Sequence, residues 1–171
     1  INVMKALHSG GIKILEFTNR GDFAWDVFNE LEKYCSVNLP DMILGAGSIS
    51  DETMANMYIS SGSNFIVGPL TNEGVALACN RKKIPYMPGC LTPTEISKAE
   101  ELGCDVVKVF PADPDIGPAF IKSVLAPMPW SWIMPTGGVD MEEEGLKKWL
   151  NSGVFSVGMG SNLFTKEIIE N

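Results

Sequence analysis

Short apolar runs that recur at a regular spacing constrain the fold of this chain more than any other feature of its sequence. Seven runs rich in Ile, Val and Met lie about 20 to 30 residues apart, which is the length of one strand followed by one helix. Each run is too short for a helix and almost continuously apolar, as expected for parallel strands buried on both faces. The runs are Ile12–Phe17, Met42–Ala46, Asn64–Gly68, Ile84–Met87, Asp105–Phe110, Ser131–Pro135 and Val154–Met159.

Helical stretches with capping residues lie between these runs. The clearest signal is Thr92-Pro93-Thr94-Glu95, where an N-cap threonine, a proline at the first helical position and a glutamate at the third predict a capping box. The alternation of strands and helices predicts a parallel α/β domain, either a closed (β/α)₈ barrel or an open doubly wound sheet. Other predicted caps are Asp22 before Phe23–Tyr34, Ser50 before Asp51–Ser60 and Asp140 before Met141–Leu150.

The two ends of the sequence favour the barrel. A helical stretch, Asn2–Ser9, begins the chain and another, Asn162–Glu170, ends it, so that eight helices accompany seven strands. A (β/α)₈ barrel needs one more strand, and we expect this strand to precede Ile1. Residues 1–171 are therefore expected to form a single barrel domain that is incomplete at its N-terminus.

Charge and composition argue against several classes of protein. The sequence has 13 Lys and Arg against 21 Asp and Glu, a net charge of −8, and no apolar run approaches the ~20 residues that span a bilayer. We expect a cytoplasmic protein without general affinity for nucleic acid or membrane. The spacing of the four cysteines matches no metal or redox motif, so buried thiols are expected. Because His8 is the single histidine of the sequence, a metal site built from several histidines is excluded.

Two charged residues, Lys108 and Glu16, stand inside apolar runs where a charge is costly. If their faces line the interior of a barrel, the period-2 alternation of strands brings both side chains into one cavity. Loss of hydration lowers the pKa of a buried ammonium group, and the free amine can then attack a carbonyl to form a Schiff base. A neighbouring carboxylate can move the protons that this chemistry requires. A structural Lys–Glu ion pair is the alternative.

Glycine-rich turns follow the last two runs. Pro135-Thr136-Gly137-Gly138 and Gly158-Met159-Gly160-Ser161 offer backbone N–H groups and a helix N-terminus. Counting the absent strand, these are the loops after strands 7 and 8, where barrels usually bind phosphate. The alternative is that each glycine only permits a tight turn. The segment Gly45-Ala46-Gly47-Ser48 has two glycines but not the third that a dinucleotide-binding motif needs, so it is only a weak signal for such a site.

Five motifs, in this order and spacing, resemble the 2-keto-3-deoxy-6-phosphogluconate (KDPG) / 4-hydroxy-2-oxoglutarate (KHG) aldolases. The resemblance covers essentially the whole sequence and implies a (β/α)₈ barrel, a Schiff-base aldolase without metal or cofactor, and a homotrimer. The motifs are Leu15-Glu16-Phe17-Thr18-Asn19-Arg20, Gly45-Ala46-Gly47-Ser48, Pro85-Tyr86-Met87-Pro88-Gly89, Val107-Lys108-Val109-Phe110-Pro111-Ala112 and Pro135-Thr136-Gly137-Gly138.

The resemblance also implies a role for each site residue. Lys108 resembles the Schiff-base lysine and Glu16 the general acid and base. Ser48 stands where the family has threonine, which keeps the hydroxyl and loses the methyl group. The remaining implied roles are binding of the substrate carboxylate by Arg20 and Ser48, shaping of the pocket by Phe110 and Thr136, and binding of phosphate by Gly137, Gly138 and Ser161.

The expected reaction of such a carbon–carbon lyase is cleavage of a small-molecule substrate, a 2-keto-3-deoxy-6-phospho sugar acid or 4-hydroxy-2-oxoglutarate. The products are pyruvate and an aldehyde, glyceraldehyde 3-phosphate or glyoxylate. Two alternatives are another phosphosugar enzyme on the same fold, such as an epimerase or synthase, and a non-catalytic sugar-phosphate-binding barrel. Lys108 with Glu16 favours the aldolase over an epimerase, which does not need an amine on a strand.

Overall fold

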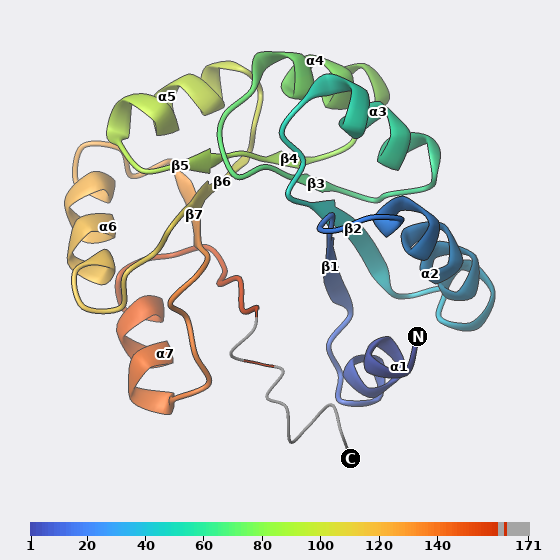
Figure 1. The fold of residues 1–171 in the computed structure, drawn as a ribbon. Helices are drawn as coiled ribbons and strands as arrows, with labels where there is room; N and C mark the ends of the chain where they lie inside the picture. The colour runs from blue at the N-terminus through green and yellow to red at the C-terminus, as the bar shows by residue number, and fades with distance from the viewer. Residues whose placement is uncertain (161–162, 164–171) are drawn as a thin grey trace. The chain divides into compact units, whose positions relative to one another are not determined.

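Strands form at six of the seven apolar runs, and every pairing between them is parallel. The computed structural model describes residues 1–160 and residue 163 (Figure 1). Its strands are β1 (Ile14–Thr18), β2 (Ile43–Gly47), β3 (Ile66–Val67), β4 (Tyr86–Met87), β5 (Gly89–Cys90), β6 (Val106–Val109) and β7 (Trp132–Pro135). Its helices are α1 (Asn2–Ser9), α2 (Ala24–Asn38), α3 (Glu52–Ser60), α4 (Glu73–Lys82), α5 (Pro93–Glu101), α6 (Gly117–Leu125) and α7 (Glu143–Leu150).

The chain divides into two compact units, Ile1–Met87 and Pro88–Asn171. The first unit has a four-stranded sheet in the order β1-β2-β3-β4, and the second has a three-stranded sheet in the order β5-β6-β7. Within the first unit, α2, α3 and α4 lie on one face of the sheet (Figure 1). The sequence prediction of a parallel α/β fold is therefore confirmed.

Pro88 directly follows the strand that the sequence predicts at Ile84–Met87 and separates it from the next strand. The structure has a short β4 before Pro88 and a separate β5 after it. Proline has no backbone N–H to donate, so it ends regular pairing on one side. Its carbonyl oxygen still accepts a hydrogen bond from the Lys108 N–H at 2.9 Å, and Gly89 continues the pairing with β6.

The prediction of a regular strand at Val154–Met159 is wrong. Only one isolated parallel bridge, Thr136 to Gly158, forms in this segment. The N–H groups of Phe155 and Gly158 donate to the carbonyls of Ile133 and Pro135, both at 2.9 Å. Two steps along β7 thus face three steps along the partner segment, an irregularity of the kind seen at a β-bulge. Pro135 also lacks the N–H that a regular ladder would use.

The predicted helix boundaries are right at Thr92 and wrong at three other caps. The Thr92 hydroxyl accepts from the Glu95 N–H at 3.2 Å, and a Glu95 oxygen accepts from the Thr92 N–H at 2.8 Å, which confirms the capping box. α2 begins after Phe23 rather than Asp22, α3 is capped by Asp51 rather than Ser50, and α7 begins after Glu142. The Asp140 carboxylate instead accepts from the Glu142 N–H at 3.0 Å. The helix predicted at Asn162–Glu170 lies outside the described residues apart from residue 163.

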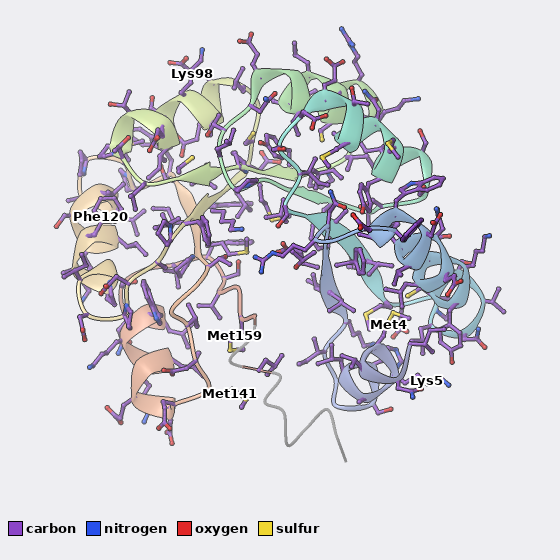
Figure 2. The ribbon with its side chains drawn as sticks, viewed as in Figure 1. Met4, Lys5, Lys98, Phe120, Met141 and Met159 are labelled. Carbon is purple, nitrogen blue, oxygen red and sulfur yellow. The ribbon has the colours of Figure 1, made fainter. Side chains whose placement is uncertain are left out.

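The core of the first unit is built from the helix-facing side of its sheet. The Phe28 ring packs against Phe17 of β1 and Tyr58 of α3, with centroid distances of 5.8 and 4.9 Å. Met4 of α1, labelled in Figure 2, is buried, and its sulfur accepts from the Cys35 thiol at 3.1 Å. All four cysteines are buried thiols, as predicted. None of the helices in the described part of the chain is long and apolar enough to cross a membrane.

Asp41, just before β2, contacts two basic side chains near the end of α1. Lys13 Nζ donates to Asp41 Oδ2 at 2.6 Å, and His8 Nε2 lies 2.7 Å from Asp41 Oδ1. The hydrogen bonds from Lys13 and then His8 lower the pKa of the Asp41 carboxyl from its ordinary value of 3.8 to about 2. A carboxyl whose pKa is depressed by folding stabilises the folded state above its ordinary pKa, and this contribution is lost as the pH falls toward 2.

We therefore predict that Asp41→Asn lowers the urea midpoint of unfolding at pH 5, where the parent carboxyl is ionised. The difference between variant and parent should shrink as the pH falls from about 4 toward 2. Urea titrations at a series of pH values measure it, with Asp105→Asn, at another exposed aspartate, as the control. A difference that stays constant down to pH 2 would contradict the assignment.

Candidate active site

Glu16 lies on the face of β1 that points away from the helices. Phe17, its neighbour, packs on α2, so the alternation of the strand turns Glu16 to the opposite side. The Glu16 side chain is half-buried, and its carboxylate lies directly against the Cα of Gly47. A Cβ at position 47 would be 1.7 Å from Glu16 Oε1, so only glycine leaves room for the carboxylate in this position.

Arg20 and Ser48 follow the carboxyl ends of β1 and β2, two adjacent strands. The Asn19 N–H donates to the Gly47 carbonyl at 2.9 Å, which extends the β1–β2 pairing by one residue beyond the strands. Ser48 is half-buried with φ of 60°, a left-handed conformation that is uncommon for residues other than glycine. The first unit thus brings Glu16, Arg20 and Ser48 to the same end of two neighbouring strands.

Lys108 lies in the middle strand of the second unit, where its side chain is only 6% exposed. β6 pairs with β5 and β7 on its two sides, so Lys108 stands opposite Gly89 and Met134. The Nζ atom lies over the Phe110 ring, 4.6 Å from the centroid. The face of an aromatic ring attracts a cation, and the attraction strengthens when the pair is shielded from water.

The turn after β7 lies beside Phe110. Gly137 and Gly138 have φ of 81° and 70°, and a Cβ on Gly137 would be 3.5 Å from the Phe110 ring. At Gly138 a Cβ would be 2.4 Å from the Ala112 carbonyl oxygen, so both φ and space require glycine there. The buried Thr136 Oγ1 has no hydrogen-bond partner among the residues that the structure describes.

The second unit thus brings Lys108, Phe110, Thr136, Gly137 and Gly138 to the carboxyl ends of β6 and β7. The unpartnered Thr136 hydroxyl and the buried Lys108 amine give this unit two polar groups for a ligand. Ser161, the remaining predicted site residue, lies outside the described residues. Across residues 1–160 and 163, no group of three His, Cys, Asp or Glu side chains could hold a metal ion.

Two further residues, Gly47 and Pro88, help to build these sites, although the sequence alone gives little indication of their roles. Gly47 permits the approach of Glu16, a requirement that depends on which strand lies beside β2. Pro88 accepts the Lys108 N–H while ending β4. A glycine or proline at a strand end is usually a turn signal, and only the pairing of the strands reveals the second role.

Comparison with solved structures defines the class of fold first. KDPG aldolase from Legionella pneumophila, captured with pyruvate as a covalent carbinolamine intermediate, is 26% identical to this chain with a TM-score of 0.86. The match covers 99% of this chain and 79% of that one. The mixed α/β fold with parallel strands is therefore the fold of these aldolases.

Sequence comparison then gives the family. The 2-dehydro-3-deoxy-phosphogluconate aldolases of Haemophilus influenzae and Treponema pallidum are 33% and 32% identical over 79% and 82% of this chain. The matched regions are 62% and 65% of those proteins, so the chain spans less than two thirds of these curated relatives. The profile of the KDPG and KHG aldolases matches residues 1–171, and the chain belongs to this family.

The contact between Glu16 and Gly47 generates a prediction about stability. Gly47→Ala should lower the free energy of unfolding, because the new Cβ displaces the Glu16 carboxylate and overpacking costs about 1–3 kcal/mol. In a Glu16→Ala background the same substitution should cost much less. Urea unfolding of the four proteins in this double-mutant cycle measures the coupling.

Gly45→Ala is the matched control on the same strand. A Cβ there would be 2.3 Å from the Phe65 ring rather than from Glu16. Its cost should therefore be the same with and without the Glu16 side chain. Equal costs of Gly47→Ala in the two backgrounds would show that Glu16 does not depend on the space at Gly47.

Proposed function

We propose that the protein is a Schiff-base aldolase that cleaves a 2-keto-3-deoxy-6-phospho sugar acid, 4-hydroxy-2-oxoglutarate or both. The observation that carries the proposal is Lys108, an amine buried in the middle strand of a sheet. Removal of an ammonium group from water favours the neutral amine, which is the nucleophile in this chemistry. Membership of the KDPG and KHG aldolase family supports the same reaction.

The proposed reaction begins at the C2 ketone of the substrate. The Lys108 amine attacks C2 to form a carbinolamine, which loses water to leave an iminium. Glu16, a half-buried carboxylate from another of the five family motifs, is the proposed carrier of the protons in both steps. The positive iminium is the electron sink for the bond cleavage that follows.

Cleavage starts with removal of the C4 hydroxyl proton, by Glu16 directly or through water. The C3–C4 bond breaks, its electron pair moves into an enamine of pyruvate, and an aldehyde leaves. Protonation of C3 and addition of water at C2 release pyruvate and restore the amine. Glyceraldehyde 3-phosphate is the aldehyde from the phosphorylated substrate, and glyoxylate is the aldehyde from 4-hydroxy-2-oxoglutarate.

The other site residues have proposed roles in holding the two ends of the substrate. Arg20 and Ser48 bind the carboxylate of the keto acid, since a guanidinium and a hydroxyl both donate hydrogen bonds to it. Phe110 and Thr136 shape the pocket, and the orphan Thr136 hydroxyl supports a contact with a polar substrate group. The proposed phosphate binders are Gly137, Gly138 and Ser161.

The two units are proposed to be parts of one (β/α)₈ barrel domain. Within the described residues β1 has a neighbouring strand only on its β2 side, and Ile14 at its start is 63% exposed. An unpaired strand edge is a liability that barrels remove by closure, so a further strand beside β1 would complete the sheet. The homotrimer implied by the family stays a prediction.

Trapping with borohydride tests the proposed nucleophile. Incubation with pyruvate and borohydride should add a reduced pyruvyl group to Lys108, located by peptide mass mapping. Lys108→Met, which keeps a long side chain without an amine, should abolish both trapping and aldol cleavage. Lys122→Ala, at an exposed lysine of α6, is the matched control and should retain both.

An adduct on a lysine other than Lys108, or its persistence in Lys108→Met, would refute the assignment. Absence of any adduct in the parent protein would instead favour the two alternatives. These are another phosphosugar enzyme on this fold and a sugar-phosphate-binding protein without aldolase chemistry.

Proton transfer by Glu16 gives a separate prediction. General acid–base catalysis is worth about 10²–10⁴-fold, so Glu16→Gln should lower kcat by about that factor. Steady-state assays of aldol cleavage measure it, with Glu30→Gln on the exposed surface of α2 as the control. Unchanged turnover in a folded Glu16→Gln protein would leave only a structural role for the carboxylate.

A further inference from the structure

Asn19, the residue before Arg20, is held by a buried tyrosine on a different element. The Tyr58 hydroxyl of α3 donates to Asn19 Oδ1 at 2.8 Å, and Asn19 Nδ2 donates to the Met54 sulfur at 3.7 Å. Both partners belong to α3, and they lie 35 and 39 residues further along the chain. The side chain of Asn19 is therefore directed at the helix layer rather than at the face that carries Glu16.

Tyr58 is a rigid donor for this bond. Its side chain is only 2% exposed, and its ring makes an edge contact with Phe28 at a centroid distance of 4.9 Å. Burial raises the pKa of the phenol above its ordinary value, so the hydroxyl keeps its proton at physiological pH. A fixed ring with a protonated hydroxyl can hold Asn19 in one position.

The backbone of Asn19 connects this bond to the proposed carboxylate site. Its N–H donates to the Gly47 carbonyl at 2.9 Å, and the next N–H, that of Arg20, donates to the Thr18 carbonyl at 2.9 Å. Arg20 follows Asn19, and Ser48 follows Gly47. Fixing Asn19 therefore fixes the starting points of both proposed carboxylate-binding side chains.

From these contacts we infer that Tyr58 and Asn19 are positioning residues, which hold Arg20 and Ser48 in place to bind the carboxylate of a 2-keto acid. We call the Tyr58–Asn19 hydrogen bond the α3 latch. The inference rests on the proposed function, because it assigns the latch to one end of the proposed substrate. Neither side chain is required to touch the substrate, so the latch should act on binding of the carboxylate and not on the chemistry at C2.

Tyr58→Phe tests the latch, because it removes the hydroxyl and keeps the packed ring. A typical hydrogen bond contributes enough to change an equilibrium by roughly 2- to 10-fold. We expect the half-saturating concentration of pyruvate for borohydride trapping to rise about 2- to 10-fold. The neutral methyl ester of pyruvate, which has the same ketone and no carboxylate charge, should show the same half-saturation as with the parent protein.

Tyr86→Phe is the matched control within the same unit. Tyr86 is also buried, and its hydroxyl donates to the Leu70 carbonyl at 2.9 Å in the loop after β3. Its loss should leave the ratio of pyruvate to ester half-saturation unchanged. Asn19→Ala removes the acceptor of the latch and should raise the half-saturation for pyruvate as Tyr58→Phe does. Adding Tyr58→Phe to Asn19→Ala should then have no further effect.

Amide hydrogen exchange reads the latch without any catalytic step. Exchange at the Asn19 and Arg20 N–H groups should be about 2- to 10-fold faster in Tyr58→Phe and unchanged in Tyr86→Phe. Equal shifts for pyruvate and its ester, or no shift for either, would overturn the positioning role. Failure of the parent to form any adduct would refute the proposed aldolase, and unchanged exchange in Tyr58→Phe would independently refute the latch.

Discussion

Parallel pairing of short strands is the constraint on which the rest of this structure depends. In each unit it brings the carboxyl ends of neighbouring strands to one edge of the sheet, where residues of the strands lie near those that follow them. Glu16, Arg20 and Ser48 gather in this way beside β1 and β2, and Lys108, Phe110 and Thr136 gather beside β6 and β7. The pairing uses backbone N–H groups, so the prolines at 88 and 135 mark the places where it changes.

Features that depend on a few consecutive residues could be predicted from the sequence. The Thr92 capping box needs only the residues from 92 to 95, and it forms as expected. The burial of Lys108 follows from the apolar residues on both sides of it in β6. Family motifs point to the same residues that the structure gathers at the strand ends, because both reflect the same order of strands and loops.

Features that depend on a distant partner could not be predicted in the same way. The Val154–Met159 segment has the composition of a strand, but its pairing depends on Pro135 and on an extra residue opposite β7. The Tyr58–Asn19 bond joins residues 39 positions apart, and nothing local to either residue indicates the other.

The missing side chain of Gly47 has a consequence for how this family of sequences can vary. Because the Glu16 carboxylate occupies the space where a Cβ would stand, positions 16 and 47 form one steric unit although they are on different strands. An alanine at 47 is incompatible with glutamate in its present rotamer, and shortening residue 16 to aspartate would not remove the overlap, because Cγ of Glu16 would itself lie 2.7 Å from the new Cβ. Directed-evolution libraries that alter either position should therefore randomise both together, since the side chain that fits at one position depends on the side chain at the other.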